Sequence, residues 1–113
     1  MKLITAVLNP GQFDEVMRAA TDAGARGLTC TEVRGFGQQF GYPEPSAVSS
    51  GRGALVVPKL RVDIVVQDET AEPVVGAIAK AINTGTIGGG KIWVSPVEAV
   101  LRARTGERDR DAV

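Results

Sequence analysis

Short apolar runs and helical repeats alternate along the chain, and in its first third they predict a strand, a helix and a second strand. Residues 3–8 form an apolar run that stops at Asn9 and Pro10, as expected for a buried strand that leads into a helix. Apolar residues then recur at helical spacing, and Gly24 follows them where a helix C-terminus favours glycine. Residues 28–33 alternate and include several β-branched side chains, which predicts a strand.

The same order repeats in the second half of the chain. Residues 60–66 alternate between apolar and mostly polar side chains, which predicts a half-buried strand. Pro73 is predicted to open a helix that ends near Asn83, and residues 91–94 form the last strand. Two β-α-β units predict an α+β fold, the ferredoxin-like βαββαβ sandwich, in which a four-stranded antiparallel sheet carries both helices on one face.

Three segments lie outside these elements. Residues 97–103 are predicted to add a short helical turn, and the tail 104–113 is too polar to pack alone. Residues 35–57 connect the second and third strands, although compact domains seldom keep structureless connections longer than about 12 to 15 residues. We therefore predict that 35–57 is a mobile arm that docks on a partner and orders there; a loose hairpin tip is the alternative.

The second face of the predicted sheet is also partly apolar, because several strands carry apolar side chains on both faces. A lone subunit would leave this surface in water. The pattern therefore predicts self-association.

Composition excludes several classes of protein. The 113 residues fit a single domain, 1–113, and 13 basic and 13 acidic residues cancel, so we expect no broad nucleic-acid footprint. There is no histidine and one cysteine, Cys30, which excludes disulfides, His-containing zinc sites and Cys/His nucleophile pairs. No apolar run approaches membrane-spanning length and the N-terminal run is too short for a signal peptide, so we expect a cytoplasmic protein.

The sequence GTIGGGK at 85–91 has the spacing of a phosphate-binding P-loop, but its context is reversed. A P-loop follows a strand, opens a helix and ends in a Ser or Thr that holds Mg²⁺, whereas here a helix precedes the glycines and Ile92 follows the lysine. Two interpretations stay open: an ordinary glycine turn, or a nest of backbone N–H donors that binds an anion with help from Lys91. Lys59, Arg102 and Arg104 would contribute only if the fold gathers them.

Taken together, MKLITAVLNP, TEVRGFGQQ, PKLRVDIVV, TGTIGGGKIWVSPVEAV and RTGER cover most of the chain, and the sequence resembles the PII signal-transduction family. The resemblance implies a non-catalytic homotrimer that binds ATP or ADP in clefts between neighbouring subunits. It identifies 35–57 as the family's T-loop, 83–91 as its B-loop and 102–113 as its C-loop and tail.

The resemblance also implies roles for individual residues. Gln39 would complete the coordination of an ATP-bound Mg²⁺ that holds 2-oxoglutarate, and Lys59 would contact that acid. Loop residues would bind the partner: Phe40, Tyr42, Ser49, Arg52 and Leu55. Nucleotide contacts are implied at Thr29, Gly37, Gln38, Lys59, Asp63, Gly88, Gly89, Gly90, Lys91, Arg102 and Arg104, the two arginines reaching the site from a neighbour.

The chain departs from the family's pattern at several positions. Gln38 stands where the family often has arginine, and Gly89 where it often has aspartate. The loop tip lacks the tyrosine that many members modify, so nucleotidylylation is not expected. Pro43 and Pro45 narrow the shapes available to the loop, which suggests a divergent member with its own partner.

The function predicted from these observations is regulatory. The loop would control an ammonium transporter or a nitrogen-metabolism enzyme, and a membrane would be reached only through such a transporter. The alternative is a PII-like regulator of another transporter or of carbon metabolism with an altered ligand response. A small nucleotide hydrolase and a metal-binding trimer are disfavoured, because no candidate base or metal-ligand cluster stands out in the sequence.

Overall fold

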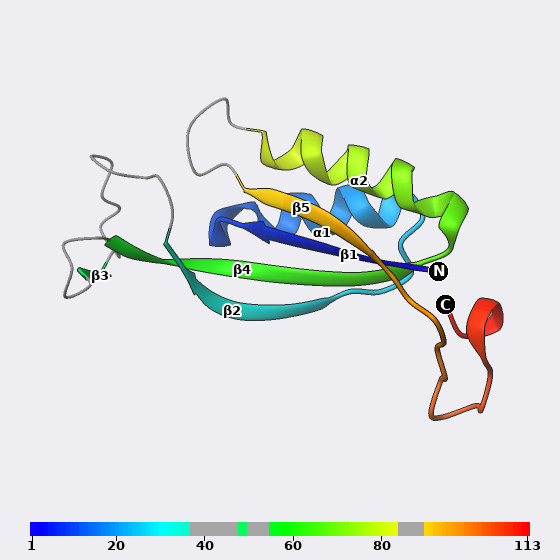
Figure 1. Cartoon of the computed structure of the whole chain (residues 1–113). Helices are drawn as coiled ribbons and strands as arrows, with labels where there is room; N and C mark the ends of the chain where they lie inside the picture. Colours follow the sequence, from blue (N-terminus) through cyan, green and yellow to red (C-terminus); the bar gives the residue numbers. More distant parts are fainter. Residues whose placement is uncertain (37–47, 50–54, 84–89) are drawn as a thin grey trace.

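The computed structural model of the chain describes residues 1–36, 48–49, 55–83 and 90–113, and it has the predicted order of strands and helices (Figure 1). The elements are β1 (Lys2–Leu8), η1 (Pro10–Gln12), α1 (Phe13–Asp22), β2 (Thr29–Gly35), β3 (Val48–Ser49), β4 (Leu55–Val66), α2 (Asp68–Ile82), β5 (Lys91–Pro96) and η2 (Asp109–Ala112).

The strands form an antiparallel sheet in the order β2-β4-β1-β5, and the short β3 pairs with the beginning of β4. Both helices lie on one face of this sheet (Figure 1). The α+β ferredoxin-like prediction is therefore confirmed.

The core lies between the helices and the face of the sheet that they cover. Every second residue of β1 faces this layer, because side chains alternate along a strand. One stripe of each helix meets them, since apolar residues recur there at helical spacing. The apolar residues of this layer with at most 1% exposure are Ile4, Ala6, Leu8, Val16, Ala20, Val62, Ile64, Val74 and Ile78.

The ends of the first helical segment follow from local sequence, as predicted. The Gln12 side chain accepts a hydrogen bond of 2.9 Å from the Asn9 backbone N–H, and Pro10 occupies the first position of η1. Gly24 follows α1 with φ +118°, a conformation that glycine adopts without a steric penalty.

Two predicted element boundaries are wrong. Helix α2 begins at Asp68, and Pro73 lies inside it; the two acidic residues of its first turn suit the helix dipole, and the proline removes one backbone donor. Strand β4 begins at Leu55 rather than at residue 60. The pairing of β4 with β1 ends at Leu60, so at Pro58 only β2 lies beside β4. Pro58 is tolerated because proline, which lacks a backbone N–H, is accepted where a strand is paired on one side only.

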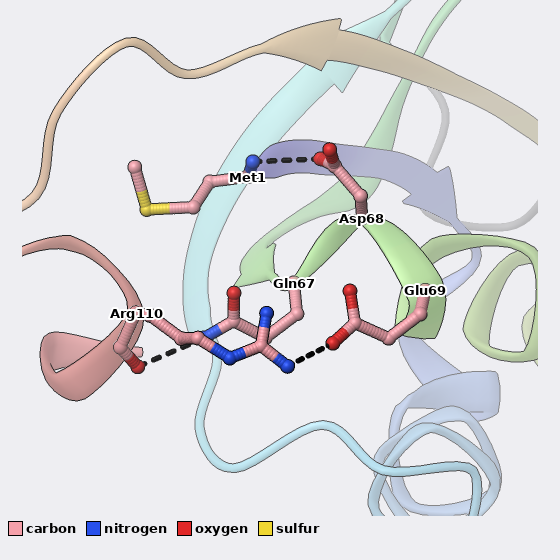
Figure 2. Close-up of polar contacts among 5 residues, drawn as sticks. All are labelled: Met1, Gln67, Asp68, Glu69 and Arg110. Carbon is pink, nitrogen blue, oxygen red and sulfur yellow. Dashed lines mark hydrogen bonds and ion pairs between the residues drawn. The ribbon is translucent and has the colours of Figure 1, made fainter.

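The C-terminal region also differs from the prediction. Residues 97–103 form no helical turn, because Leu101 pairs with Arg108 in an antiparallel bridge. The polar tail, predicted not to pack alone, is held by residues at the start of α2. The Gln67 side chain donates a hydrogen bond of 2.9 Å to the Arg110 carbonyl, and Arg110 pairs with Glu69 at the start of α2 (Figure 2).

Candidate functional site

Much of the predicted site lies outside the described residues: Gly37, Gln38, Gln39, Phe40, Tyr42, Arg52, Gly88 and Gly89. Ser49 and Leu55 are described only as backbone of β3 and β4, so part of the predicted loop is a strand pair. The remaining predicted residues fall into four groups on the fold.

The first group surrounds Lys59 on β4. This lysine is only 8% exposed, and its ammonium donates to the side-chain oxygen of Asn9. Gly35 of β2 lies close by, since a Cβ there would be 3.2 Å from the Cγ of Lys59. A cavity of about 510 Å³ next to them also touches Arg34 and Glu32. The Lys59 ammonium is therefore held in position by Asn9, close to Gly35, where segment 35–57 begins.

The second group is the end of the glycine loop. Gly90 has φ +122°, and a Cβ added to it would lie 2.6 Å from the carbonyl oxygen of Val7 and 2.9 Å from the Cδ1 of Ile82. Glycine is thus required here by both backbone conformation and space. Lys91 opens β5 directly after it, exposed and paired with Val7. The close approach of the loop to β1 fixes where Lys91 emerges.

The third group is on the sheet face that the helices leave uncovered. Thr29 of β2 lies opposite Asp63 of β4. The Asp63 carboxylate accepts hydrogen bonds from the Thr5 hydroxyl at 2.8 Å and from the Arg61 Nε at 3.1 Å. Sequence reasoning missed Thr5 and Arg61. The signal for Arg61 was its place two residues before Asp63, which puts both on the same face of a strand.

The tail holds the remaining predicted residues, Arg102 and Arg104. One terminal nitrogen of the Arg102 guanidinium lies 3.2 Å from the Glu107 carboxylate, and the other donates to the Ala112 carbonyl at 3.4 Å. Arg104 is exposed. A cavity of about 580 Å³ lies between the tail and the start of α2, and Glu107, Arg110 and Glu69 are among the residues that line it.

Two carboxylates at the start of α2, Asp68 and Glu69, have lowered pKa values (Figure 2). The Met1 ammonium donates to Asp68 at 2.6 Å, and this hydrogen bond and its charge lower the pKa of the Asp68 carboxyl. The pKa of Glu69 is lowered by a hydrogen bond from its own backbone N–H and then by Arg110. Both carboxylates are ionised near neutral pH.

One chain does not bring all these groups together. Strand β4, which carries Lys59, and β5, which opens with Lys91 directly after Gly90, both begin toward one end of the sheet, and the tail that carries Arg102 and Arg104 follows the other end of β5 (Figure 1). The predicted contacts in the tail therefore lie away from the start of β5 in the same chain (Figure 1).

Comparison with known proteins identifies the family. A family model described as nitrogen regulatory protein P-II matches residues 1–107. The chain belongs to this family. It is 47% identical to the nitrogen regulatory protein P-II of Rhizobium meliloti (strain 1021), 48% to that of Rhizobium leguminosarum bv. viciae and 46% to that of Microchaete diplosiphon. Each alignment covers all of both chains.

P-II proteins are non-catalytic signal-transduction regulators that bind small-molecule effectors and act on partner proteins, so the prediction of a nitrogen regulator rather than an enzyme is confirmed. Within the described ranges, no helix is long and apolar enough to span a membrane. No group of three or more His, Cys, Asp or Glu side chains in the same ranges is placed to hold a metal ion.

Proposed function

We propose that this P-II protein senses adenine nucleotides as a homotrimer, with ATP or ADP bound between neighbouring subunits. The observation that supports the proposal most directly is the separation of the predicted nucleotide contacts toward opposite ends of one sheet. The tail of one copy can complete the site only at the glycine loop of another copy. Assembly and nucleotide binding are therefore coupled in this proposal.

Each described group receives a role that fits its chemistry. Lys59, Gly90 and Lys91 hold the phosphates from one subunit, because ammonium groups and backbone N–H donors bind anions with charge-assisted hydrogen bonds. Thr29 and Asp63 contact the adenine. Arg102 and Arg104 reach the phosphates from the neighbour, where arginine can donate two parallel hydrogen bonds.

The predicted contacts outside the described residues complete this proposal. Gly37, Gln38, Gly88 and Gly89 approach the nucleotide through the backbone or through polar side chains. Gln39 coordinates an ATP-bound Mg²⁺ that also holds 2-oxoglutarate, and Lys59 contacts that acid.

The output is a change in the population of two shapes of segment 35–57. A ligand shifts such an equilibrium only by the difference between its affinities for the two states. Mg²⁺-ATP with 2-oxoglutarate favours one shape and ADP the other, and a nitrogen-metabolism enzyme or an ammonium transporter binds one of them through the loop. A cytoplasmic location stays a prediction.

Calorimetry tests the proposal directly. Wild type is titrated with ATP, ADP and AMP, with and without Mg²⁺ and 2-oxoglutarate, and its assembly mass is measured by light scattering. We expect three copies per particle and binding of ATP and ADP. Lys91→Ala should weaken both nucleotides, Gln39→Ala should abolish only the response to 2-oxoglutarate, and Lys80→Ala, an exposed lysine of α2, is the matched control.

The outcomes separate the alternatives. If wild type binds none of the nucleotides, the proposed function is wrong. If it binds nucleotides but does not respond to 2-oxoglutarate, the regulator of another transporter or of carbon metabolism replaces the leading proposal. Gln38 and Gly89, where the family often has charged residues, are the positions that favour this second candidate.

A further inference from the structure

Arg102 and Glu107 hold the two sides of a tight turn in the tail. The Arg102 N–H donates to the Glu107 carbonyl at 2.9 Å, and the Gly106 N–H donates to the Arg102 carbonyl at 2.8 Å. Gly106 has φ +76°, which glycine permits, and the bridge between Leu101 and Arg108 closes the turn. Backbone hydrogen bonds, together with the side chains of Thr105 and Asp109, therefore shape this part of the tail.

The side chains add a contact that the turn does not need. The Arg102 guanidinium lies 3.2 Å from the Glu107 carboxylate, with side-chain exposures of 40% and 43%. Such a half-exposed pair contributes little to stability, because water and salt screen it. The contact nevertheless places the Glu107 carboxylate beside the Arg102 guanidinium, which binds nucleotide phosphates in the proposed function.

We propose that Glu107 is a specificity-determining residue that weakens binding of the more highly charged nucleotide. This inference rests on the proposed function, in which Arg102 binds the phosphates of a nucleotide held by the neighbouring subunit. The Glu107 carboxylate competes with the phosphates for the guanidinium, and it repels them as a like charge. Both effects raise the dissociation constant.

The penalty grows with the charge of the ligand. ATP carries one phosphate group more than ADP and two more than AMP, and the Coulomb repulsion from a fixed carboxylate increases with each added charge. Glu107 thus reduces the preference for ATP over ADP that the cations alone would produce. Mg²⁺ neutralises part of the polyphosphate and should reduce the penalty on ATP.

Glu107→Gln isolates this effect, because it removes the charge but keeps the shape of the side chain and an oxygen that can accept from Arg102. The backbone contacts of the turn do not involve the carboxylate, so the turn should persist. Glu98→Gln is the matched control: Glu98 is exposed in the segment after β5, and its replacement changes the net charge by the same amount. Arg102→Gln and the double variant E107Q/R102Q complete a double-mutant cycle.

The experiment is calorimetry of ATP, ADP and AMP without Mg²⁺ on these variants, at two salt concentrations. We expect E107Q to lower the dissociation constant for ATP about two- to fivefold, the range given by exposed ion pairs. The gain should be smaller for ADP, smallest for AMP, reduced by salt and smaller on the R102Q background, where only the direct repulsion between Glu107 and the phosphates remains, and E98Q should bind like wild type.

Failure of the inference is distinct from failure of the proposed function. Equal or weaker ATP binding by E107Q than by E98Q, in a protein whose wild type binds ATP, overturns the role of Glu107 and leaves the nucleotide site intact. An equal gain on the R102Q background overturns it too, because the carboxylate would then act without Arg102. A wild type that binds no nucleotide overturns both.

Discussion

Thr5 donates a hydrogen bond of 2.8 Å from its hydroxyl to the Asp63 carboxylate, on the face of the sheet that both helices leave uncovered. Thr5 is nevertheless completely buried, and its cross-strand neighbours are Asp63 and Trp93. Arg61 donates to the same carboxylate from two residues away. Two donors thus fix the direction of Asp63 on a surface where a lone carboxylate would rotate freely.

Thr5→Val should lower the free energy of unfolding by about 0.5–1.5 kcal/mol, since it keeps the shape of the side chain but removes the hydroxyl donor. Urea denaturation measures the loss. Thr31→Val is the control, because Thr31 is exposed on β2 on the same sheet face. Equal stability of the two variants would show that the bond to Asp63 contributes nothing.

Gly90→Ala should be strongly destabilising, by about 1–3 kcal/mol, because alanine at φ +122° is strained and its Cβ would collide with the Val7 carbonyl oxygen. Gly76→Ala is the matched control. Gly76 lies inside α2 with no atom within 4 Å of an added Cβ, so alanine should stabilise the helix by about 0.5–1 kcal/mol. Thermal and urea denaturation of both variants test whether Gly90→Ala lowers the free energy of unfolding while Gly76→Ala raises it. Destabilisation of the same size in both variants would contradict this prediction.

The sequence predicted the parts of the fold that depend on neighbouring residues. The strand before Asn9, the cap at Asn9 and the glycine turn at Gly24 after α1 need only local hydrogen bonds and backbone preferences. The sheet followed because two β-α-β units have few ways to pack. The site residues came from the family resemblance; the structure describes the positions of some of them, and their roles stay a prediction.

Contacts between distant residues could not be predicted in this way. The bond of Met1 to Asp68 spans 67 positions, and it depends on where the first strand meets the second helix. The start of α2 was missed for a related reason. Pro73 looked like a first-turn residue, but tertiary packing and the acidic first turn extend the helix back to Asp68 at the cost of one hydrogen bond.

Stability should fall as the pH falls below about 4. The clasp, by which we mean the ion pairs of Met1 with Asp68 and of Arg110 with Glu69, should contribute to this loss. The folded-state pKa of Asp68 is lowered mainly by the Met1 ammonium, and that of Glu69 by a hydrogen bond from its own backbone N–H and then by Arg110. Because the pKa is lower in the folded state, the ionised carboxylate stabilises the fold fully at pH values above the ordinary carboxyl pKa. This stabilisation is lost as the pH falls through the folded-state pKa.

Denaturation of the double variant D68N/E69Q between pH 7 and about pH 3 measures that contribution. Its stability should depend less on pH than that of wild type. Glu72→Gln removes an exposed carboxyl from the same helix without touching Met1 or Arg110, so it should keep the wild-type dependence. An identical pH profile for D68N/E69Q and wild type would exclude the clasp as a source of acid sensitivity.

Val65→Lys should prevent the assembly that the proposed function requires. Val65 is 38% exposed in the lone chain and shares the uncovered sheet face with Trp93, which is 42% exposed. A lysine buried there between copies would leave a charge without a partner, which is unfavourable.

Met17→Lys is the control, because Met17 is similarly exposed, at 41%, but lies on α1. Light scattering should show three chains for wild type and M17K but mainly single chains of 11.8 kDa for V65K, with circular dichroism confirming that V65K is folded. A folded V65K that keeps the wild-type mass would place the subunit interface elsewhere.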